Sequence, residues 1–431
     1  MTYKRSYLKT ALHILLFLTI FLTIISPIVK PTNKPNILLI VVDTLRADHL
    51  GYNGYEKNTS PNIDLFSKEC MVFKNAYSQS GWTFPSFCTI FTSLHPREHG
   101  AVTWDTKLNQ EIITLPEVLQ ENGYTTYGYP SLFRLNKESG IAQGFDHFRK
   151  GVIELGNPVV VTSSQKVNEL IINDLDSIQQ PFFIWAHYFD PHNNYNYYPE
   201  FGFGVSDIGK YDGEIAYTDR YIGNLLDELK RRGLYDDMTI IFTADHGEEF
   251  WEHGGNFHHC LYDEVLKIPL LIKTPKSQHT GNHDIYVDQL DIATTILSLA
   301  GIENPDQFTG RNLINPEIEY RPVFSEMRIP KYPFQKAIIH DGHKYYQLRG
   351  DPNKKYAERF KNYDNQLYNL LEDPNEENNI FSDWNLVNDR ITELEYRMTD
   401  FYRKPIPYYS SEDLLDEKTI IKLKSLGYIV E

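Results

Sequence analysis

Two aspartates directly follow apolar runs of the sequence, and one of them is followed by a histidine. Asp43 ends the run of residues 35–42, and Asp245 with His246 ends the run of residues 238–244. Parallel strands of an open α/β sheet present their carboxyl ends at one edge, so we expect these side chains to lie close together. Carboxylates and an imidazole that converge there form a site for one divalent cation, whose identity stays open between Ca²⁺, Mg²⁺, Mn²⁺ and Zn²⁺.

A hydroxyl that could act as a nucleophile comes from Thr83. It lies two residues before Pro85, and apolar residues follow with helical spacing, at Phe87, Ile90, Phe91 and Leu94. Proline is favoured in the first turn of a helix, so a helix is predicted to begin at or next to Thr83. Backbone N–H groups and the helix dipole favour an anion there. Threonine is also a common N-cap, and this stretch alone favours that role; beside a cation site, Thr83 becomes the candidate nucleophile.

Several histidines also follow strand-like runs. His192 lies in the Asp190-Pro191-His192 turn, five residues after His187 at the end of the run 181–187, and His253 and His258 follow Asp245. Imidazoles exchange protons near neutral pH and can protonate a leaving oxygen. Structural roles are more typical of the isolated His49, His95 and His99.

These motifs resemble, in order and spacing, the sulfatase family of the alkaline phosphatase superfamily. The matching segments are residues 35–46, 59–62, Thr83-Phe84-Pro85-Ser86, 182–187, Asp190-Pro191-His192, Thr243-Ala244-Asp245-His246-Gly247-Glu248, 252–254, 261–264, 267–270, 367–374 and 423–428. The resemblance spans nearly all of the chain after residue 34.

The resemblance implies a metal-dependent ester hydrolase and a role for each matching residue. The residues that match metal-binding positions are Asp43, Thr83, Asp245 and His246. Thr83 also occupies the position of the family's nucleophile. His192 and His253 match histidines that contact the ester oxygens or protonate the leaving group. His258 lies near the position of a substrate-contacting lysine in many relatives, and Arg46 matches the arginine beside the first aspartate, where a packing role is equally open.

The chain departs from the sulfatase motif in two places. That motif reads Cys/Ser-x-Pro-Ser-Arg, and its first residue is oxidised to formylglycine; here Thr83 stands first and Phe87 replaces the arginine. Thr44 stands where relatives have a second aspartate. Both changes resemble the threonine-nucleophile branches, namely phosphodiesterases, phosphonate monoester hydrolases and phosphoglycerol or phosphoethanolamine transferases. A threonyl ester needs a second displacement, which suits phosphoryl groups, so the substrate stays open between a sulfuric and a phosphoric ester.

The elements that must position these residues alternate between apolar runs and helical patterns. Strands are predicted for residues 35–42, 125–129, 181–187, 238–244 and 268–273, and helices for 215–229 and 288–300. This alternation is typical of an α/β fold, in which a large, mainly parallel sheet is sandwiched by helices; the resemblance makes it alkaline-phosphatase-like.

Three regions are predicted along the chain. Residues 1–34 form a cytoplasmic basic tail, a transmembrane signal anchor and a linker, and residues 35–318 form the catalytic domain. Residues 319–431 form a C-terminal α+β subdomain, because short strand-like runs at 322–324, 336–339 and 344–348 precede one helix at 388–403. A small antiparallel sheet with a covering helix is expected there.

The N-terminus predicts export. Lys4, Arg5 and Lys9 precede residues 11–29, which contain no Lys, Arg, Asp or Glu. As a helix this stretch would be about 28 Å long, enough to cross the hydrocarbon of a bilayer. We expect a membrane anchor with an extracytoplasmic body; secretion after signal-peptide cleavage is the alternative.

Composition limits the partners. The 431 residues carry a formal charge of -16, which argues against nucleic acid, and 30 Tyr with 24 Phe predict a packed globular body. The charge of an anionic ester, on a glycan, lipid or small molecule, must therefore be met locally. Three widely spaced cysteines predict core thiols rather than a disulfide framework. The alternative of another class is a catalytically inactive, membrane-tethered binding protein that keeps the fold.

Overall fold

The structure, a computed structural model, describes residues 34–103, 105–151, 163–329, 333–349 and 365–405. The chain divides into two units, Met1–Lys34 and Pro35–Glu431. The predicted anchor at residues 11–29 lies outside the described residues. Within the described ranges, no helix has the length and apolar character needed to cross a membrane.

The second unit is built on a large mixed sheet with the strand order β11-β2-β10-β6-β1-β5-β3-β4. Its strands are β1 (Ile37–Val42), β2 (Met71–Tyr77), β3 (Thr125–Tyr129), β4 (His147–Phe148), β5 (Phe182–Tyr188), β6 (Thr239–Ala244), β10 (Leu270–Lys273) and β11 (Gly281–Asp288), and the short β9 (Lys267–Ile268) pairs with β2. β10 and β9 run antiparallel to their neighbours, and the other pairs are parallel. The predicted mainly parallel sheet is therefore confirmed.

β1 lies at the centre of this sheet, between β5 and β6. All six of its side chains are buried, because helices cover both faces, and this explains its unbroken apolar sequence. Its last residue, Val42, pairs with Ala244 of β6 and with Tyr188 of β5. The residues that follow these strands therefore emerge side by side.

Two of the longer strands, β2 and β11, were not predicted from the sequence, for one physical reason. β2 contains Lys74 and Asn75, and β11 begins with exposed polar residues because it is the edge strand of the sheet. Neither has the continuous apolar run that marks a central strand. The helix predicted for 288–300 begins later, at Leu290, because Asp288 ends β11.

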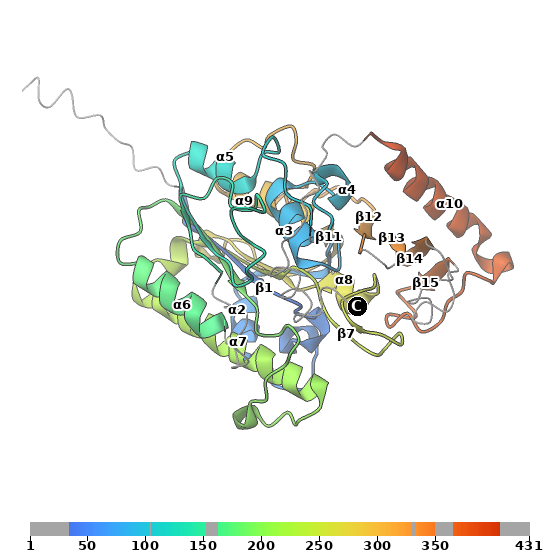
Figure 1. Ribbon diagram of the computed structural model, residues 1–431, viewed down its shortest axis with the longest axis horizontal. Coiled ribbons are helices and arrows are strands. Elements are labelled where there is room, and N and C mark those ends of the chain that lie inside the picture. Colours follow the sequence, from blue (N-terminus) through green and yellow to red (C-terminus); the bar gives the residue numbers. More distant parts are fainter. Residues whose placement is uncertain (1–33, 104, 152–162, 330–332, 350–364, 406–431) are drawn as a thin grey trace, which may run out of the picture. The chain divides into compact units, whose positions relative to one another are not determined.

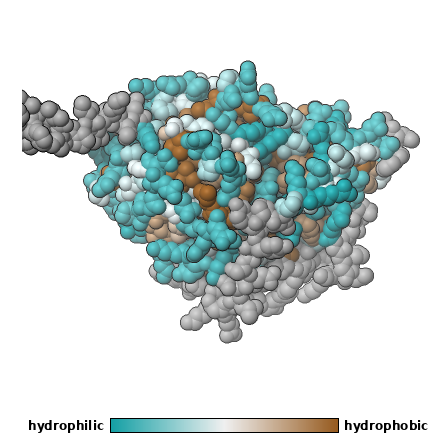
Figure 2. Space-filling model, turned by 90° about the horizontal axis from the view of Figure 1, so that it is seen from above, coloured by the Kyte–Doolittle hydropathy of each residue, from teal (hydrophilic) through white to brown (hydrophobic). Residues whose placement is uncertain are grey.

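Helices cover the sheet in two layers (Figure 1). One layer contains α2 (Pro61–Ser67), α6 (Ser163–Asp174) and α7 (Asp207–Arg231), and the other contains α3 (Thr83–Thr92), α5 (Leu115–Glu121) and α9 (Leu290–Leu299). α7 buries the apolar face predicted from Ile215, Ile222, Leu225, Leu226 and Leu229. Figure 2 shows a mainly hydrophilic surface with one band of hydrophobic residues between the polar ones.

Short elements complete the main body. They are α4 (Pro96–His99), α8 (Asp263–Leu266), the hairpin of β7 (Glu249–Phe250) and β8 (Asn256–Phe257), and five 3-10 helices: η1 (Ala47–His49), η2 (Gly51–Asn53), η3 (Pro199–Phe201), η4 (Tyr235–Asp237) and η5 (Pro275–Ser277). All three cysteines are buried and none is disulfide-bonded, as predicted.

The C-terminal part contains a separate antiparallel sheet of β12 (Val323–Met327), β13 (Phe334–His340), β14 (His343–Arg349) and β15 (Gln366–Asn369). One face of this sheet packs on α10 (Trp384–Arg403) through Ile338, Tyr345, Leu367, Ile391, Leu394 and Met398. The opposite face joins the main core through Ala337, Ile339 and Tyr346. The small antiparallel sheet with its helix agrees with the sequence prediction.

A buried cation links this sheet to the main body. Lys344 of β14 has no exposed side-chain surface, and its Nζ lies 3.0 Å from Asp263 Oδ1 and 2.9 Å from Glu376 Oε1. Glu376 also accepts a hydrogen bond from the Asp263 N–H. Removing one partner of such a buried group leaves an uncompensated charge, which costs more than the original contact stabilised.

We predict that Lys344→Met lowers the free energy of unfolding by about 3 kcal/mol, because Asp263 and Glu376 lose their buried counter-charge. Urea denaturation of the full chain measures this effect. Lys276→Met is the matched control; its amine is exposed, 3.8 Å from Asp237, and its loss should cost under about 1 kcal/mol. Equal effects of the two substitutions would contradict the prediction.

Candidate active site

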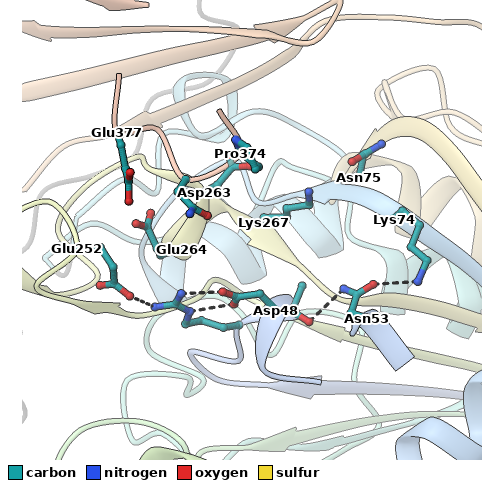
Figure 3. Close-up of a pocket in the computed structure, with 13 residues that line it drawn as sticks. Asp48, Asn53, Lys74, Asn75, Glu252, Asp263, Glu264, Lys267, Pro374 and Glu377 are labelled. Carbon is teal, nitrogen blue, oxygen red and sulfur yellow. Dashed lines mark hydrogen bonds and ion pairs between the residues drawn. The ribbon is translucent and has the colours of Figure 1, made fainter. Parts of the chain in front are cut away.

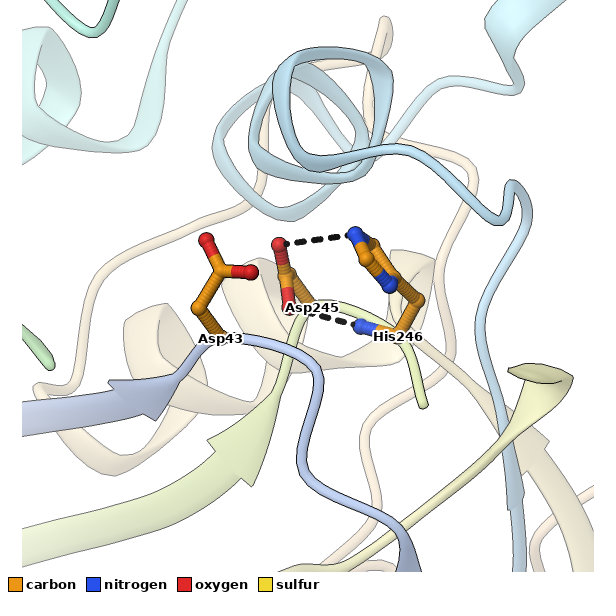
Figure 4. Close-up of side chains that lie close together, drawn as sticks. All are labelled: Asp43, Asp245 and His246. Atoms are coloured by element: carbon orange, nitrogen blue, oxygen red, sulfur yellow. Dashed lines mark hydrogen bonds and ion pairs between the residues drawn. The ribbon is translucent and has the colours of Figure 1, made fainter. Parts of the chain in front are cut away.

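Three ligand-type side chains converge where β1 and β6 end. Because Val42 pairs with Ala244, the next residues, Asp43 and Asp245, lie side by side, and His246 follows. One ligand atom from each of the three lies within 4.8 Å of the others. All three side chains are fully buried, and Figure 4 shows them pointing toward one another. The structure thus brings together the group expected from the sequence.

In each of the two carboxylates, one oxygen accepts hydrogen bonds from the protein and the other accepts none. Asp245 Oδ1 accepts from the backbone N–H groups of Thr44 at 3.1 Å and His246 at 2.8 Å. Asp43 Oδ2 accepts from His187 Nε2 at 3.2 Å. Among the described residues, Asp43 Oδ1 and Asp245 Oδ2 have no hydrogen-bond donor. Burial, and then the charge of Asp245, raise the pKa of Asp43 well above its ordinary value.

The orientation of His246 completes a donor set for a cation. Its Nδ1 lies 2.9 Å from the Gly247 carbonyl oxygen and donates to it, so Nε2 carries the lone pair of the neutral ring. That nitrogen lies 3.4 Å from Asp245 Oδ2. Two carboxylate oxygens without donors and one imidazole lone pair fit a divalent cation, and hard or borderline metals suit this set equally.

His187 is a site residue that sequence reasoning missed, although its place at a strand end is the signal that identified Asp43. Its Nδ1 accepts from the Ser131 N–H at 3.2 Å, so Nε2–H donates to Asp43. Burial lowers the pKa of His187 to about 4, which keeps the ring neutral. Phe87 packs edge-on against the ring at 4.9 Å. The phenylalanine in the sequence motif therefore supports a histidine that orients a ligand.

Thr83 is the first residue of α3, and Trp82 occupies the N-cap position. The Thr83 hydroxyl therefore does not serve as the cap; it lies 3.3 Å from His246 Nε2 and 3.5 Å from Asp43 Oδ2. The turn before the helix needs glycine, because a Cβ at Gly81 would lie 2.9 Å from the His258 carbonyl oxygen. This close approach packs the chain before Thr83 against the His258 segment.

Two further predicted histidines, His192 and His258, belong to the same group. The His258 ring lies 4.5 Å from that of His246 and 5.3 Å from that of His192. His192 donates from Nδ1 to the Asn193 carbonyl oxygen at 2.6 Å and stacks on Phe189 at 4.4 Å. Burial, and then His258, lower the pKa of His192 well below its ordinary value.

Glu248 holds His258 in place. This carboxylate is fully buried; it accepts from His258 Nδ1 at 3.1 Å and from the Tyr195 hydroxyl at 3.0 Å. The imidazole therefore turns its other nitrogen away from Glu248. In the sequence Glu248 belongs to the motif after Asp245, but its distance from His258 along the chain gives no signal of this pairing.

The structure places His253 and Arg46 outside this group. His253 Nε2 lies 2.9 Å from Glu264 Oε1, and the ring stacks on Tyr262 at 3.7 Å. Burial opposes the charged form of His253, but the bond to Glu264 outweighs it and raises the pKa. Arg46 donates to both carboxylate oxygens of Asp48, to the Glu252 carboxylate and to a backbone carbonyl.

Arg46 lines a pocket of about 600 Å³ that is distinct from the Thr83 group. Lys74 and Lys267 lie toward one side of it, and Glu252, Glu264 and Glu377 toward the other (Figure 3). Neither Asp43 nor His246, which lie near the Thr83 hydroxyl, lines this pocket. Within it Arg46 pairs with Asp48 and Glu252, whereas Asp263 and Glu264 pair with Lys344 and His253, which do not line it.

The three histidines for which structural roles were expected also lie elsewhere. His49 Nδ1 lies 2.8 Å from Asp212 Oδ1, and His99 Nδ1 accepts from the Ala101 N–H. His95 is the N-cap of α4. None of them contacts the two aspartates that end β1 and β6 in the part of the chain described.

Known proteins resemble this chain in sequence and in fold. The family model described as Sulfatase matches residues 35–302, and one described as N-sulphoglucosamine sulphohydrolase, C-terminal, matches residues 251–404. An ulvan-active sulfatase of Formosa agariphila is 24% identical over 87% of this chain and 84% of its own length. A solved 2-O GAG sulfatase shares the fold with a TM-score of 0.73 at 18% identity, over 88% of this chain and 95% of its own. The phosphonate monoester hydrolase of Agrobacterium radiobacter also shares the fold, with a TM-score of 0.67 at 19% identity over 84% of this chain and 96% of its own.

We predict that a divalent cation stabilises the fold through Asp43 and Asp245. At a hundredfold excess over its dissociation constant it should raise Tm by roughly 4 °C, and Asp245→Asn should abolish this shift. The protein is first treated with a chelator and then reloaded with Mn²⁺, Ca²⁺, Mg²⁺ or Zn²⁺. Calorimetry gives the shift in Tm, and metal analysis gives the bound metal per chain. Glu377→Gln, a carboxylate of the separate pocket, should leave the shift intact. A wild-type protein that retains no metal would contradict the site.

We predict that His187→Ala weakens metal binding roughly 10- to 100-fold, because Asp43 loses the donor that orients it. His187→Gln keeps an N–H donor and should recover part of the loss. Isothermal titration with the metal identified above gives the dissociation constants. Identical constants for wild type and both variants would show that His187 only fills space.

Proposed function

This chain belongs to the sulfatase family, and we propose that it cleaves an anionic ester with Thr83 as its nucleophile and a divalent cation at the ends of β1 and β6. The observation that carries the proposal is the position of the Thr83 hydroxyl. It lies at the first turn of α3, with His246 Nε2 at 3.3 Å and Asp43 Oδ2 at 3.5 Å. A buried hydroxyl between two acceptors is oriented for attack on an electrophile.

The reaction follows from the roles of these groups. Thr83 Oγ1 gives its proton to a neighbouring acceptor and forms a bond to the sulfur or phosphorus of the ester, while the bond to the leaving oxygen breaks. An anionic ester next to the ring would raise the lowered pKa of His192, so that its charged form can give a proton to that oxygen, and His258 contacts the ester oxygens. A cation held by Asp43, Asp245 and His246 would supply Lewis acidity, which lowers the pKa of a coordinated hydroxyl and stabilises charge on the ester.

Water completes the turnover by attacking the threonyl ester, with Thr83 as the leaving group. The alternative is attack by an acceptor alcohol, which makes the protein a phosphoglycerol- or phosphoethanolamine-type transferase. A formylglycine hydrate expels sulfate without this second displacement, but a threonine cannot form one. The threonine therefore favours a second candidate function, as a phosphodiesterase or phosphonate monoester hydrolase.

The names of relatives bear on the substrate. An ulvan-active sulfatase and a 2-O GAG sulfatase support an ester on an anionic saccharide, whereas the phosphonate monoester hydrolase supports the phosphorus alternative. We propose a saccharide ester first. The assay that separates the two compares an aryl sulfate, a phosphate diester and a phosphonate monoester under one set of conditions.

We also propose that the body works outside the cytoplasm, anchored by residues 11–29, or secreted if that stretch is cleaved. The basic residues before an uncharged stretch of this length support the proposal. We also propose that residues 35–318 form the catalytic domain and that residues 319–431 form its C-terminal subdomain.

We predict that Thr83→Ala lowers kcat/KM at least about 10³-fold, because removal of a nucleophile leaves only binding and electrostatic stabilisation. Thr83→Ser, which keeps the hydroxyl, should retain measurable turnover. Both variants are assayed on the three substrates above and checked for bound metal. Undiminished activity of Thr83→Ala removes the nucleophile assignment, and a metal-replete wild type inactive on every ester favours the binding-protein alternative.

A further inference from the structure

A cationic groove lies on the C-terminal sheet, between β13, β14 and the end of α10. Its volume is about 330 Å³, and its charged lining residues are Lys336, Arg349, Glu395 and Arg403. We propose that this groove binds the sulfate or phosphate ester groups of an anionic polysaccharide, at a site separate from Thr83.

Strand register explains why these cations gather. Lys336 pairs with Gln347, and Phe334 pairs with Arg349, in the antiparallel ladder of β13 and β14. Side chains alternate between the faces of a sheet, so Lys336 and Arg349 share the face that α10 covers. Arg403, the last residue of α10, closes the groove from the helix side.

The groove has an excess of positive charge, although the chain as a whole carries -16. Its one lining carboxylate, Glu395, accepts from the Tyr345 hydroxyl at 2.7 Å. Within the described ranges, no carboxylate forms an ion pair with Lys336, Arg349 or Arg403. Glu326 of β12 is the cross-strand neighbour of Lys336, and its charge acts on that lysine without an ion pair. The three cations of the groove still outnumber Glu326 and Glu395, so an anion that enters from solvent would meet a net positive charge.

Lys336 has the surroundings of an anion-binding lysine. Its Nζ lies 3.5 Å from the centre of the Tyr402 ring and 4.9 Å from that of Phe334, so aromatic faces hold it in place. Burial, and then the charge of Arg349, lower the pKa of Lys336 to about 8. A bound oxyanion would relieve this repulsion between cations.

The helix dipole accounts for only part of this cluster. Cations are favoured at a helix C-terminus, and α10 ends beside the groove. Arg97, however, already donates to the carbonyl oxygens of Phe401, Tyr402 and Lys404 there. Lys336 and Arg349 belong to strands, and no described helix-end carbonyl accepts from them.

The groove also offers contacts suited to sugar rings. Thr399 supplies a side-chain donor and acceptor for hydroxyls, and Tyr402 supplies an aromatic face. Several cations along one groove fit ester groups carried on a chain better than a single free ion. The face that α10 covers is opposite the face that joins the main core, so a saccharide held here does not occupy the Thr83 group.

The test measures binding of size-defined dextran sulfate to the full chain, with neutral dextran and sodium sulfate as comparisons. Lys336→Ala with Arg349→Ala should weaken binding at least tenfold and reduce the slope of log K against log salt concentration by about two, one for each cation removed. Arg349→Gln with Arg403→Gln alters only exposed groups, so it keeps the test valid if the first pair fails to fold. Lys276→Ala with Arg231→Ala, two exposed cations on η5 and α7 that do not line the groove, is the matched control.

Each outcome decides the proposal. Loss of dextran sulfate binding in both groove variants, with binding retained in the control pair and in Thr83→Ala, supports it, whatever the outcome for the nucleophile. Unchanged affinity in the groove variants overturns it. So does equal competition by sodium sulfate at the same sulfate concentration, which marks a single-ion site. The proposal is also overturned if the groove variants lose binding to phosphatidylserine vesicles but keep their binding to dextran sulfate, because the groove then serves a membrane surface.

Discussion

Two carboxylates buried side by side impose the condition on which the site depends. The register of β1 and β6 places Asp43 and Asp245 next to each other, away from water. Two such charges are costly without compensation, as the raised pKa of Asp43 indicates. The surrounding chain supplies hydrogen bonds to one oxygen of each and leaves the others for a cation. The same condition that makes the pair unfavourable by itself suits it to bind a divalent cation.

The residues around this pair are arranged in consequence. His187 donates a hydrogen bond to Asp43, and its own ring is fixed by the Ser131 N–H and by the edge of Phe87. Glu248 orients His258 in a similar way, by accepting a hydrogen bond from its Nδ1. α3 begins where its first hydroxyl meets both the metal group and the end of a helix dipole. Rigid strands and a helix terminus therefore fix groups that would otherwise need an ordered loop.

The main body, which carries the Thr83 group, and the C-terminal sheet pack against each other. Lys344 ties the two with buried charge, and one face of the C-terminal sheet contributes to the main core. The other face carries α10 and the cationic groove. Because the protein is strongly acidic overall, recognition of an anionic polymer requires such a local concentration of positive charge.

The sequence by itself determined the central strands and the residues at their ends, because a strand covered on both faces must be apolar throughout and its first polar residue marks the sheet edge. β1, β5 and β6, with Asp43, Asp245 and His246, follow from that rule. β2 and β11 did not, since their polar residues break the pattern. Only the tertiary structure decided that His187 and Glu248 support the site, that His253 and Arg46 pair with other carboxylates, and that Thr83 is not the cap. Those distinctions depend on contacts between segments far apart in the chain, which local spacing does not encode.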